Sequence, residues 1–358
     1  MRLQPVAAEP TENPLVTIAI PTFNRASWLG DCVRSALSQS YRNIEVLVCD
    51  NASTDDTQTV LSEFRDPRLR VVTHDSNIGL MPNWNSCLTA AKGEHIVFLP
   101  DDDRMAPWMI ESCVALLNRE PGLVTVVALS DLRLTDEHRT LPAVPSQRLD
   151  TGTHQGADIF LEYLRGRLSV QLCGIMMRTD ALRDDGGFVN DWPYAGDTAT
   201  WGRLLMSGRA GLVNRGCGTF AWHSANATSG FSIDLRLRAD RQFVETIDAA
   251  ADRYIDESNF RASIKRQARR YVAHDVVSIV ASYRKSGASL KDVLPVIWRC
   301  RGELGHIGLE PGDIVNLARP AAIILLPRTV TIWLAQIRQG LRASRTRAMP
   351  DSYRSTNA

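Results

Sequence analysis

The amino-acid sequence predicts an α/β protein in which helices cover both faces of a mostly parallel sheet, followed by a helical C-terminal region. Through residues 14–130, short apolar, β-branched runs alternate with segments of helical spacing. Short connections between such runs are typical of a parallel sheet buried under helices. From residue 235 onward, apolar side chains recur every three or four positions, which is typical of helices.

The individual elements follow from these two periodicities, with strands that stop at Pro21, Asp50 and Pro100 and a helix N-cap offered by Ser53 or Thr54. The expected strands are Val16–Ile20, Ile44–Cys49, Leu69–Thr73, His95–Leu99 and Leu123–Leu129. The expected helices are Trp28–Leu37, Thr57–Phe64, Asn83–Ala91 and Met109–Leu117. Past residue 130 the pattern weakens. We expect loops over 131–170 with one helix near Ile159–Leu164, strands Gln171–Arg178 and Gly218–Trp222, and a helix Asp197–Met206.

The bulk composition fits an ordinary soluble enzyme, with 358 residues, 44% hydrophobic and 23% charged. Residues 1–13 mix Pro, Glu and Gln and are expected to be a flexible leader, not a signal peptide. No run approaches the ~20 apolar residues of a membrane-spanning helix. Seven cysteines without a CxxC pair argue against a zinc site or a disulfide framework and favour a cytoplasmic protein.

The net charge of +1 hides an uneven distribution. Residues 261–358 hold 17 Lys and Arg against 6 Asp and Glu, while residues 1–260 hold 24 against 34. The basic region could meet anionic lipid or an acidic acceptor, or it could form a face that neutralises the acidic part of the chain. Both alternatives stay open, and we expect no nucleic-acid partner.

Polar clusters follow three of the predicted strands: residues 22–25 after the first, Asp50 and Asn51 after the second, and residues 101–103 after the fourth. Ligands of parallel sheets bind at the carboxyl ends of the strands. The three consecutive carboxylates at 101–103 repel one another unless a cation offsets them. Their hard oxygens suit Mn²⁺ or Mg²⁺. The alternative is a solvated acidic turn.

Several segments together resemble glycosyltransferase family 2: PTFNR, VCDNASTDDT, NIGLMPNWN, AKGEHIVFLPDDD and the later GGF. The resemblance covers about residues 14–230 and implies the GT-A fold, a nucleotide-binding sheet of the Rossmann-like type. It implies three regions: the leader 1–13, a catalytic domain 14–232 with a nucleotide-sugar half 14–130 and an acceptor half 131–232, and a basic helical region 233–358.

The resemblance also assigns site residues by matching position. Those expected to bind the nucleotide sugar are Pro21, Thr22, Phe23, Asn24, Arg25, Asp50, Asn51, Ser53, Asn77, Gly79, Asn85, Asp101 and Asp102. Those expected to hold Mn²⁺ or Mg²⁺ are Asp103, Asp101 and His223. Phe23 would stack on the base and Asp50 would hydrogen-bond it, although packing and a helix N-terminal charge are the alternatives. The Arg that relatives carry after N-x-G is missing near Trp84.

Transfer of a sugar needs a base that takes the proton of the acceptor hydroxyl. Asp197 lies where the family carries Glu-Asp, with Gly196 in place of the Glu. We predict Asp197 as the base, with Asp191 in reserve and an N-cap as the alternative role.

These features predict a non-processive, inverting glycosyltransferase that moves one sugar from a UDP-, dTDP-, CDP- or GDP-linked donor to a glycan, lipid-linked or other hydroxyl acceptor in surface polysaccharide or glycoconjugate synthesis. The Gln-x-x-Arg-Trp motif of processive members is absent. The alternatives are a sugar nucleotidyltransferase, disfavoured because PTFNR contains no glycine, and a catalytically silent nucleotide-sugar-binding partner.

A basic amphipathic segment near the end of the chain bears an apolar face of Val330, Trp333, Leu334, Ile337 and Leu341. Such a helix can lie in a membrane interface. It could equally pack on the catalytic domain or form a homodimer. A peripheral position at the inner face of the membrane is one of these expectations.

Overall fold

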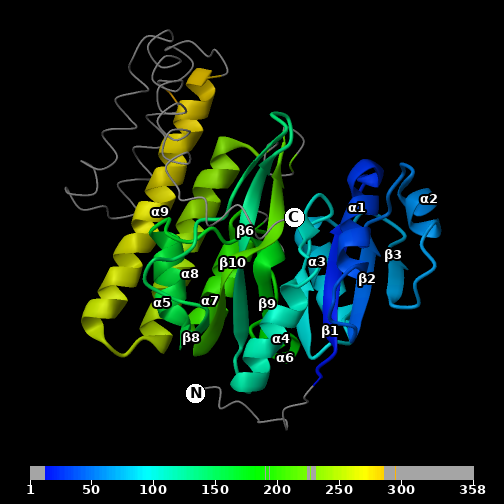
Figure 1. Cartoon of the computed structure of the whole chain (residues 1–358). Helices are drawn as coiled ribbons and strands as arrows, with labels where there is room; N and C mark the ends of the chain where they lie inside the picture. The colour runs from blue at the N-terminus through cyan, green and yellow to red at the C-terminus, as the bar shows by residue number, and fades with distance from the viewer. Residues whose placement is uncertain are drawn as a thin grey trace. The chain divides into compact units, whose positions relative to one another are not determined.

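The computed structural model describes residues 13–189, 191–192, 194–223, 226, 231–285 and 295, with side chains in the last helix described to His274. Figure 1 shows a large twisted sheet with helices on its faces. The strand order is β3-β2-β1-β4-β9-β6-β10-β5, with β7 paired to β6 and β8 paired to β10. The predicted α/β class is confirmed.

The N-terminal half of the sheet is parallel, as the alternating pattern predicts. Its strands are β1 (Val16–Thr22), β2 (Ile44–Asp50), β3 (Leu69–Thr73) and β4 (His95–Phe98). Its helices are α1 (Ala26–Leu37), α2 (Thr57–Ser62), α3 (Leu80–Ala90) and α4 (Met109–Arg119). Every residue of β1 and β2 is buried, which explains why both strands are rich in apolar residues.

The C-terminal half of the sheet is mixed. Strands β6 (Thr125–Leu134) and β10 (Arg209–Trp222) run parallel to each other, but β9 (Ile175–Arg178) lies antiparallel between β4 and β6. Three short strands, β5 (Arg104–Met105), β7 (Arg139–Leu141) and β8 (Gly152–Gln155), pair antiparallel with their neighbours. The expectation of a mostly parallel sheet therefore holds for the first half only.

Several predicted boundaries past residue 130 need correction. The segment 131–170 is not mainly loop, because it contains the end of β6, β7, β8 and α5 (Gly156–Leu164). The predicted strand Gln171–Arg178 begins with a 3-10 turn, Leu172–Gly174, before β9. The predicted strand Gly218–Trp222 is the end of a 14-residue strand, β10, whose earlier half is irregular at two bulges. Glycines 211, 216 and 218 had masked that strand's apolar alternation.

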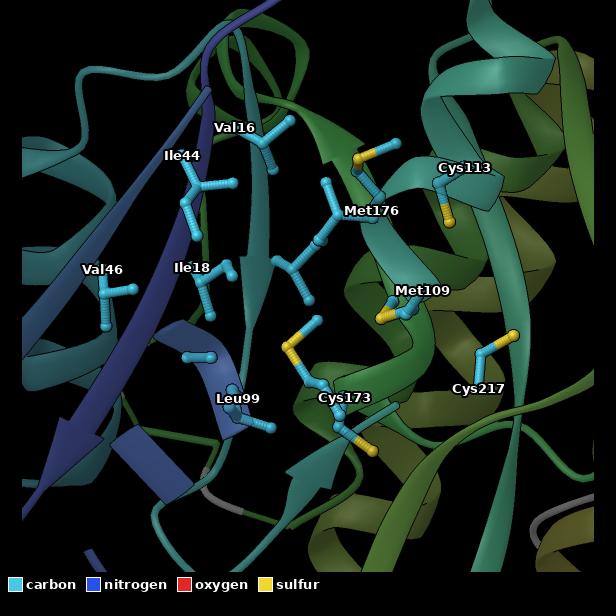
Figure 2. Packing of buried hydrophobic residues seen from close by; sticks show 14 of the residues in the cluster. Val16, Ile18, Ile44, Val46, Leu99, Met109, Cys113, Cys173, Met176 and Cys217 are labelled. Atoms are coloured by element: carbon cyan, nitrogen blue, oxygen red, sulfur yellow. The ribbon is translucent and has the colours of Figure 1, made fainter. Parts of the chain in front are cut away.

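The main core lies between β1, β2 and the helices α1 and α4. Figure 2 shows Val16, Ile18, Ile44 and Val46 from the strands facing the same cluster as Met109, Cys113 and Met176. Six of the cysteines are free and buried, so they serve as small apolar side chains.

The remaining helices are α6 (Thr179–Asp184), α7 (Gly196–Met206), α8 (Ile233–Tyr254) and α9 (Ser258–Lys285). Helix α8 packs against α7, and its N-cap Ser232 accepts a hydrogen bond from the Leu235 amide at 3.2 Å. The chain divides into two compact units between Ala268 and Arg269. The predicted functional division at residue 233 stays a prediction. The predicted amphipathic segment around Trp333 lies outside the described residues.

Among the described helices, none combines the length and the apolar character that crossing a membrane requires.

Candidate donor and metal site

The loops that follow β1 and β2 are tied to each other by hydrogen bonds. The Asn24 amide donates to Ser53 Oγ at 2.8 Å, and Asn24 Oδ1 accepts from the Thr54 amide at 2.8 Å. Asn24 and Ala52 adopt left-handed backbone conformations, with φ of 53° and 61°. Such conformations are uncommon for residues other than glycine and tend to mark functional turns. The predicted residues Asn24 and Ser53 thus form one shaped rim.

Asp50 and Asn51 lie buried behind this rim. Asp50 accepts a hydrogen bond from the Ser53 amide at 3.1 Å and another from Gln58 Nε2 at 2.5 Å. Asn51 Nδ2 donates to Asn77 Oδ1 at 2.9 Å and to the Gly79 carbonyl at 3.1 Å. The structure therefore brings together five of the predicted residues, which come from the end of β2 and from the loops after β2 and β3.

Three further predicted residues lie near the end of β1 or just after it. Pro21 is buried and pairs in register with Cys49. Phe23 is 39% exposed, which leaves its ring free for stacking instead of placing it in the core. Arg25 is partly exposed, and its charge acts on Asp101. An exposed aromatic ring and a buried carboxylate at the same edge of the sheet can together hold a nucleobase, by stacking and by hydrogen bonding.

The three consecutive carboxylates point in different directions. Asp101 Oδ2 accepts a hydrogen bond from Thr22 Oγ1 at 2.7 Å. Asp103 turns toward the sheet, where its Oδ1 accepts from the Ala221 amide at 2.8 Å. Asp102 Oδ2 lies 3.1 Å from His223 Nε2. The structure thus pairs the predicted metal ligand His223 with Asp102, not with Asp101 or Asp103.

Burial makes this cluster costly while no cation is present. Burial and the neighbouring charge of Asp102 raise the pKa of Asp101 to about 7 and raise the pKa of Asp103 well above its ordinary value. Asp103 Oδ2 is buried, and besides the Ala221 amide only the weakly donating Cys173 thiol acts on this carboxylate as a hydrogen-bond donor among the described residues. An excess of buried negative charge with a weakly hydrogen-bonded oxygen is what a bound divalent cation would relieve.

His223 is 3% exposed and is the less obvious half of the pair. Its backbone amide donates to Asn226 Oδ1 at 2.6 Å, and Asn226 Nδ2 reaches Asp102 Oδ2 at 3.4 Å. The Trp28 ring stacks on the imidazole with a centroid distance of 4.5 Å and an interplanar angle of 9°. Sequence reasoning gave neither Trp28 nor Asn226 a role in the site, because the contacts of Trp28 with His223 and of Asn226 with Asp102 form only when the chain folds.

These residues fit a divalent cation, within limits. No group of three or more His, Cys, Asp or Glu side chains converges as a metal cage in the described part of the chain. Asp102 and His223 would supply two ligands, and a diphosphate and water would supply the others. Mg²⁺-type sites in enzymes that handle phosphates commonly keep few protein ligands. The roles predicted for Asp101 and Asp103 stay predictions.

A cation that the sequence did not single out lies beside the acidic run. Arg133 Nη2 donates to the Asp102 carbonyl at 3.2 Å, and the register partner of Arg133 is Ala221. Both carboxylates Asp102 and Asp103 act electrostatically on this guanidinium. Arg133 therefore brings positive charge beside the acidic run.

Asn85 lies away from this cluster. Its Nδ2 donates to the Phe188 carbonyl at 2.7 Å, and its Oδ1 accepts from the Phe188 amide at 2.9 Å. Gly187 has a φ of 68°, and a Cβ there would lie 2.6 Å from Asn85 Oδ1. The GGF segment is thus fixed by a close approach to α3 that only glycine permits. Asn85 could contact the donor only if its two hydrogen bonds to the Phe188 backbone were broken.

Asp197 lies in the first turn of α7, partly exposed, and burial raises its pKa. The residue two positions earlier, Ala195, has a left-handed backbone with φ of 57°. A Cβ at Gly196 would lie 3.2 Å from the Trp192 ring. Trp192 therefore occupies space near the position where the family carries Glu, which accounts for the glycine. The reserve candidate, Asp191, is exposed.

Part of the chain also matches a known protein family. Residues 17–155, which contain the tied loops and the acidic run, match the model of glycosyl transferase family 2. This segment is a family 2 glycosyltransferase domain. The predicted resemblance is confirmed.

Curated relatives of the family 2 domain support the same assignment. One is the Escherichia coli UDP-Glc:alpha-D-GlcNAc-diphosphoundecaprenol beta-1,3-glucosyltransferase WfaP, 35% identical over 30% of this chain and 42% of the relative. Another is the Escherichia coli chondroitin synthase, 35% identical over 32% of this chain and 17% of the relative. The chain thus spans less than half the length of these two relatives.

Solved structures extend the likeness to the fold of most of the chain. Residues 1–349 of Staphylococcus aureus TarS in complex with UDP superpose with a TM-score of 0.61 at 16% identity, over 91% of each chain. The Pyrobaculum calidifontis mannosyltransferase PcManGT, in complex with GDP-Man and Mn²⁺, gives 0.51 at 22% identity, over 92% of this chain and 87% of its own. These likenesses confirm the GT-A fold.

Proposed function

We propose that the chain is a metal-dependent, inverting and non-processive glycosyltransferase that moves one sugar from a nucleoside-diphosphate sugar to a hydroxyl of a glycan or lipid-linked acceptor. The observation that carries this proposal is the convergence, at one edge of the sheet, of the buried Asp50, the exposed Phe23 ring and the Asp102–His223 pair. The base would meet Phe23 and Asp50, and the metal held by Asp102 and His223 would meet the diphosphate.

The donor half of the reaction is a matter of binding and charge. Asp50 would accept a hydrogen bond from the base, and the tied loops would hold the nucleoside in one orientation. Asp102 and His223 would hold Mn²⁺ or Mg²⁺, which when bound stabilises the departing nucleoside diphosphate. Arg25 and Arg133 add positive charge at the same edge. The relatives that bind UDP or GDP-Man support a nucleotide-sugar donor.

The acceptor half of the reaction needs one proton transfer. Asp197 would take the proton of the acceptor hydroxyl while its oxygen forms the bond to the anomeric carbon and the bond to the diphosphate oxygen breaks. A single displacement of this kind inverts the anomeric centre. The raised pKa of Asp197 brings its basicity closer to neutral pH, where a general base is most effective.

Lipid-linked acceptors are favoured by one relative. WfaP, which is 35% identical to this chain over 106 residues, is named for a diphosphoundecaprenol-linked acceptor. The proposed acceptor class is therefore a saccharide on a lipid diphosphate.

A second candidate is a nucleotide-sugar binder without activity, favoured by Gly196 where the family carries Glu. The two candidates separate in an assay of UDP-glucose, UDP-GlcNAc and GDP-mannose with Mn²⁺, following nucleotide release with and without a synthetic lipid-diphosphate-linked GlcNAc. We expect acceptor-dependent release from one donor and its loss in Asp197→Asn. Binding of a donor without release from any of them would favour the silent binder.

A further inference from the structure

The imidazole of His223 is held in an unusual way. A histidine that ligates a metal through one ring nitrogen normally donates its other N–H to a carboxylate, carbonyl or water, which fixes the orientation of the ring. Here Nε2 faces Asp102, but Nδ1 is buried and makes no hydrogen bond within the described part of the structure. Among the described residues, the contact with Asp102 is therefore the only hydrogen bond to this ring.

The Trp28 ring stacks on this imidazole. It lies almost parallel to the imidazole, 4.5 Å away and tilted by 9°, so it blocks one face of the imidazole. Trp28 lies in the first turn of α1, is partly exposed, and is not among the described members of the main core cluster. Its stack on His223 is therefore a contact outside the main core cluster.

We propose that Trp28 is a positioning residue for the metal ligand His223, in which aromatic stacking fixes the plane of the imidazole. The inference rests on the proposed metal site, since it names the residue that orients one ligand of that site. It predicts that an aromatic side chain is needed at position 28, independently of contacts with the donor. Loss of the stack leaves the ring free to rotate away from Asp102.

The difference between the Mn²⁺ and Mg²⁺ affinities distinguishes a positioning role of Trp28 from a merely structural one. Both ions favour oxygen ligands, but Mg²⁺ is the stricter of the two and keeps several waters, whereas the transition-metal ion Mn²⁺ also accepts imidazole. A loosened His223 should therefore weaken Mn²⁺ binding more than Mg²⁺ binding. Outer-shell partners of metal-bound histidines are worth about 10- to 100-fold in affinity, so we expect a loss of about 10-fold for Mn²⁺.

The experiment measures Mn²⁺ and Mg²⁺ affinity calorimetrically on the full chain saturated with UDP, with no turnover required. The variants are Trp28→Leu, Trp28→Met, Trp28→Phe and His223→Ala, together with the Trp28→Leu/His223→Ala double variant. Trp108→Leu is the matched control, because Trp108 is also an indole at a helix start and is 40% exposed. Trp28→Met gives a second non-aromatic side chain if the leucine variant fails to fold.

The expected result is a selective loss of Mn²⁺ affinity in the Leu and Met variants, retention within about twofold in Trp28→Phe and Trp108→Leu, and a double variant no weaker than His223→Ala. Losses that add in the double variant, or a Mn²⁺ affinity unchanged in Trp28→Leu while His223→Ala is weakened, would overturn the role of Trp28 alone. An unchanged Mn²⁺ affinity in His223→Ala would overturn the metal site itself, and the positioning role with it.

Discussion

At the scale of single residues, the site is defined by carboxylates whose surroundings differ. Asp50 accepts hydrogen bonds from Ser53 and Gln58, Asp102 faces a histidine, Asp103 is buried against the sheet, and Asp197 lies at a helix start beside Thr198. The same functional group can therefore bind a base, hold a metal or accept a proton, because burial and partners set its protonation. Two predictions separate these roles.

Asp197→Asn removes the proposed base without changing the size of the side chain. We expect turnover to fall by about 100- to 10,000-fold, while UDP affinity stays within about twofold of the wild type. Because the base acts in its ionised form and burial raises its pKa, the rate should decline as pH falls through a value above the ordinary Asp pKa. A pH–rate profile of single-turnover transfer checks this. A variant that keeps wild-type turnover would remove Asp197 from the mechanism.

Asp103→Asn should stabilise the metal-free protein. The raised pKa of Asp103 means that its ionised form is disfavoured in the fold, so at neutral pH the negative charge costs stability. We expect the free energy of unfolding to rise by on the order of 1 kcal/mol, measured by urea denaturation in the presence of a chelator. Serine at the same position is the control for lost packing. A destabilised Asn variant would mean that the carboxylate is favourably paired.

At the scale of elements, the site depends on how helices and strands approach each other. Thr22, Asp50 and the acidic run meet because β1, β2 and β4 are parallel neighbours whose carboxyl ends share an edge. Glycines and buried ion pairs set the spacing below that edge. Two predictions concern these supports.

Gly156 begins α5 where the helix touches the end of α7. A Cβ there would lie 2.0 Å from the Leu205 carbonyl oxygen and 2.9 Å from that of Gly208, and neither backbone atom can move without shifting a helix. We expect Gly156→Ala to lower the free energy of unfolding by about 1–3 kcal/mol in urea titrations. Gly208→Ala is the matched control, since a Cβ at Gly208 meets nothing within 4 Å. Equal stability of the two variants would contradict the close contact.

Glu45 links three elements at the opposite end of β2. It accepts from Thr17 Oγ1 at 2.7 Å, from the Lys92 amide at 2.5 Å and from Arg70 at 3.1 Å. Burial alone would raise the pKa of Glu45, but these hydrogen bonds and the charge of Arg70 lower it below 4.5. A carboxylate with a lowered pKa contributes stability above its unfolded pKa and loses that contribution as pH falls through the folded pKa.

Glu45→Gln should therefore cost stability at pH 7 and cost much less below pH 4. The expected loss at pH 7 is about 1–3 kcal/mol, typical of a buried hydrogen-bonded charge. Thermal unfolding of wild type and variant at both pH values checks this. A difference that does not depend on pH would mean that the charge of Glu45 contributes nothing.

At the scale of the whole molecule, the first half of the fold could be predicted from the sequence and the second half only in part. The regular alternation of strand and helix signals over 14–130 predicts β1 to β4, because each strand is a short segment rich in apolar, β-branched residues. Beyond it, β9 inserts antiparallel between β4 and β6, and glycines interrupt β10. Local periodicity carries no information about which strand pairs with which.

The candidate site, like the fold, could be predicted from the sequence only in part. The motif residues Asp50, Asn51 and Asp101 were found because they directly follow strands, where chain order and space coincide. Which of the three acidic residues meets His223 could not be predicted, since one step along the chain turns a side chain by a large angle. Trp28 is distant in sequence from His223 and belongs to no motif.

The central claim is that Asp102 and His223 hold a cation that joins the donor's diphosphate to the protein. The most direct test is a calorimetric titration of UDP, dTDP, CDP and GDP, with and without Mn²⁺, on wild type and Asp102→Asn. We predict that one of the nucleotides binds, that its affinity rises at least tenfold with Mn²⁺, and that Asp102→Asn abolishes this increase. Equal affinity with and without Mn²⁺, or an increase that survives in Asp102→Asn, would contradict the metal-linked donor site.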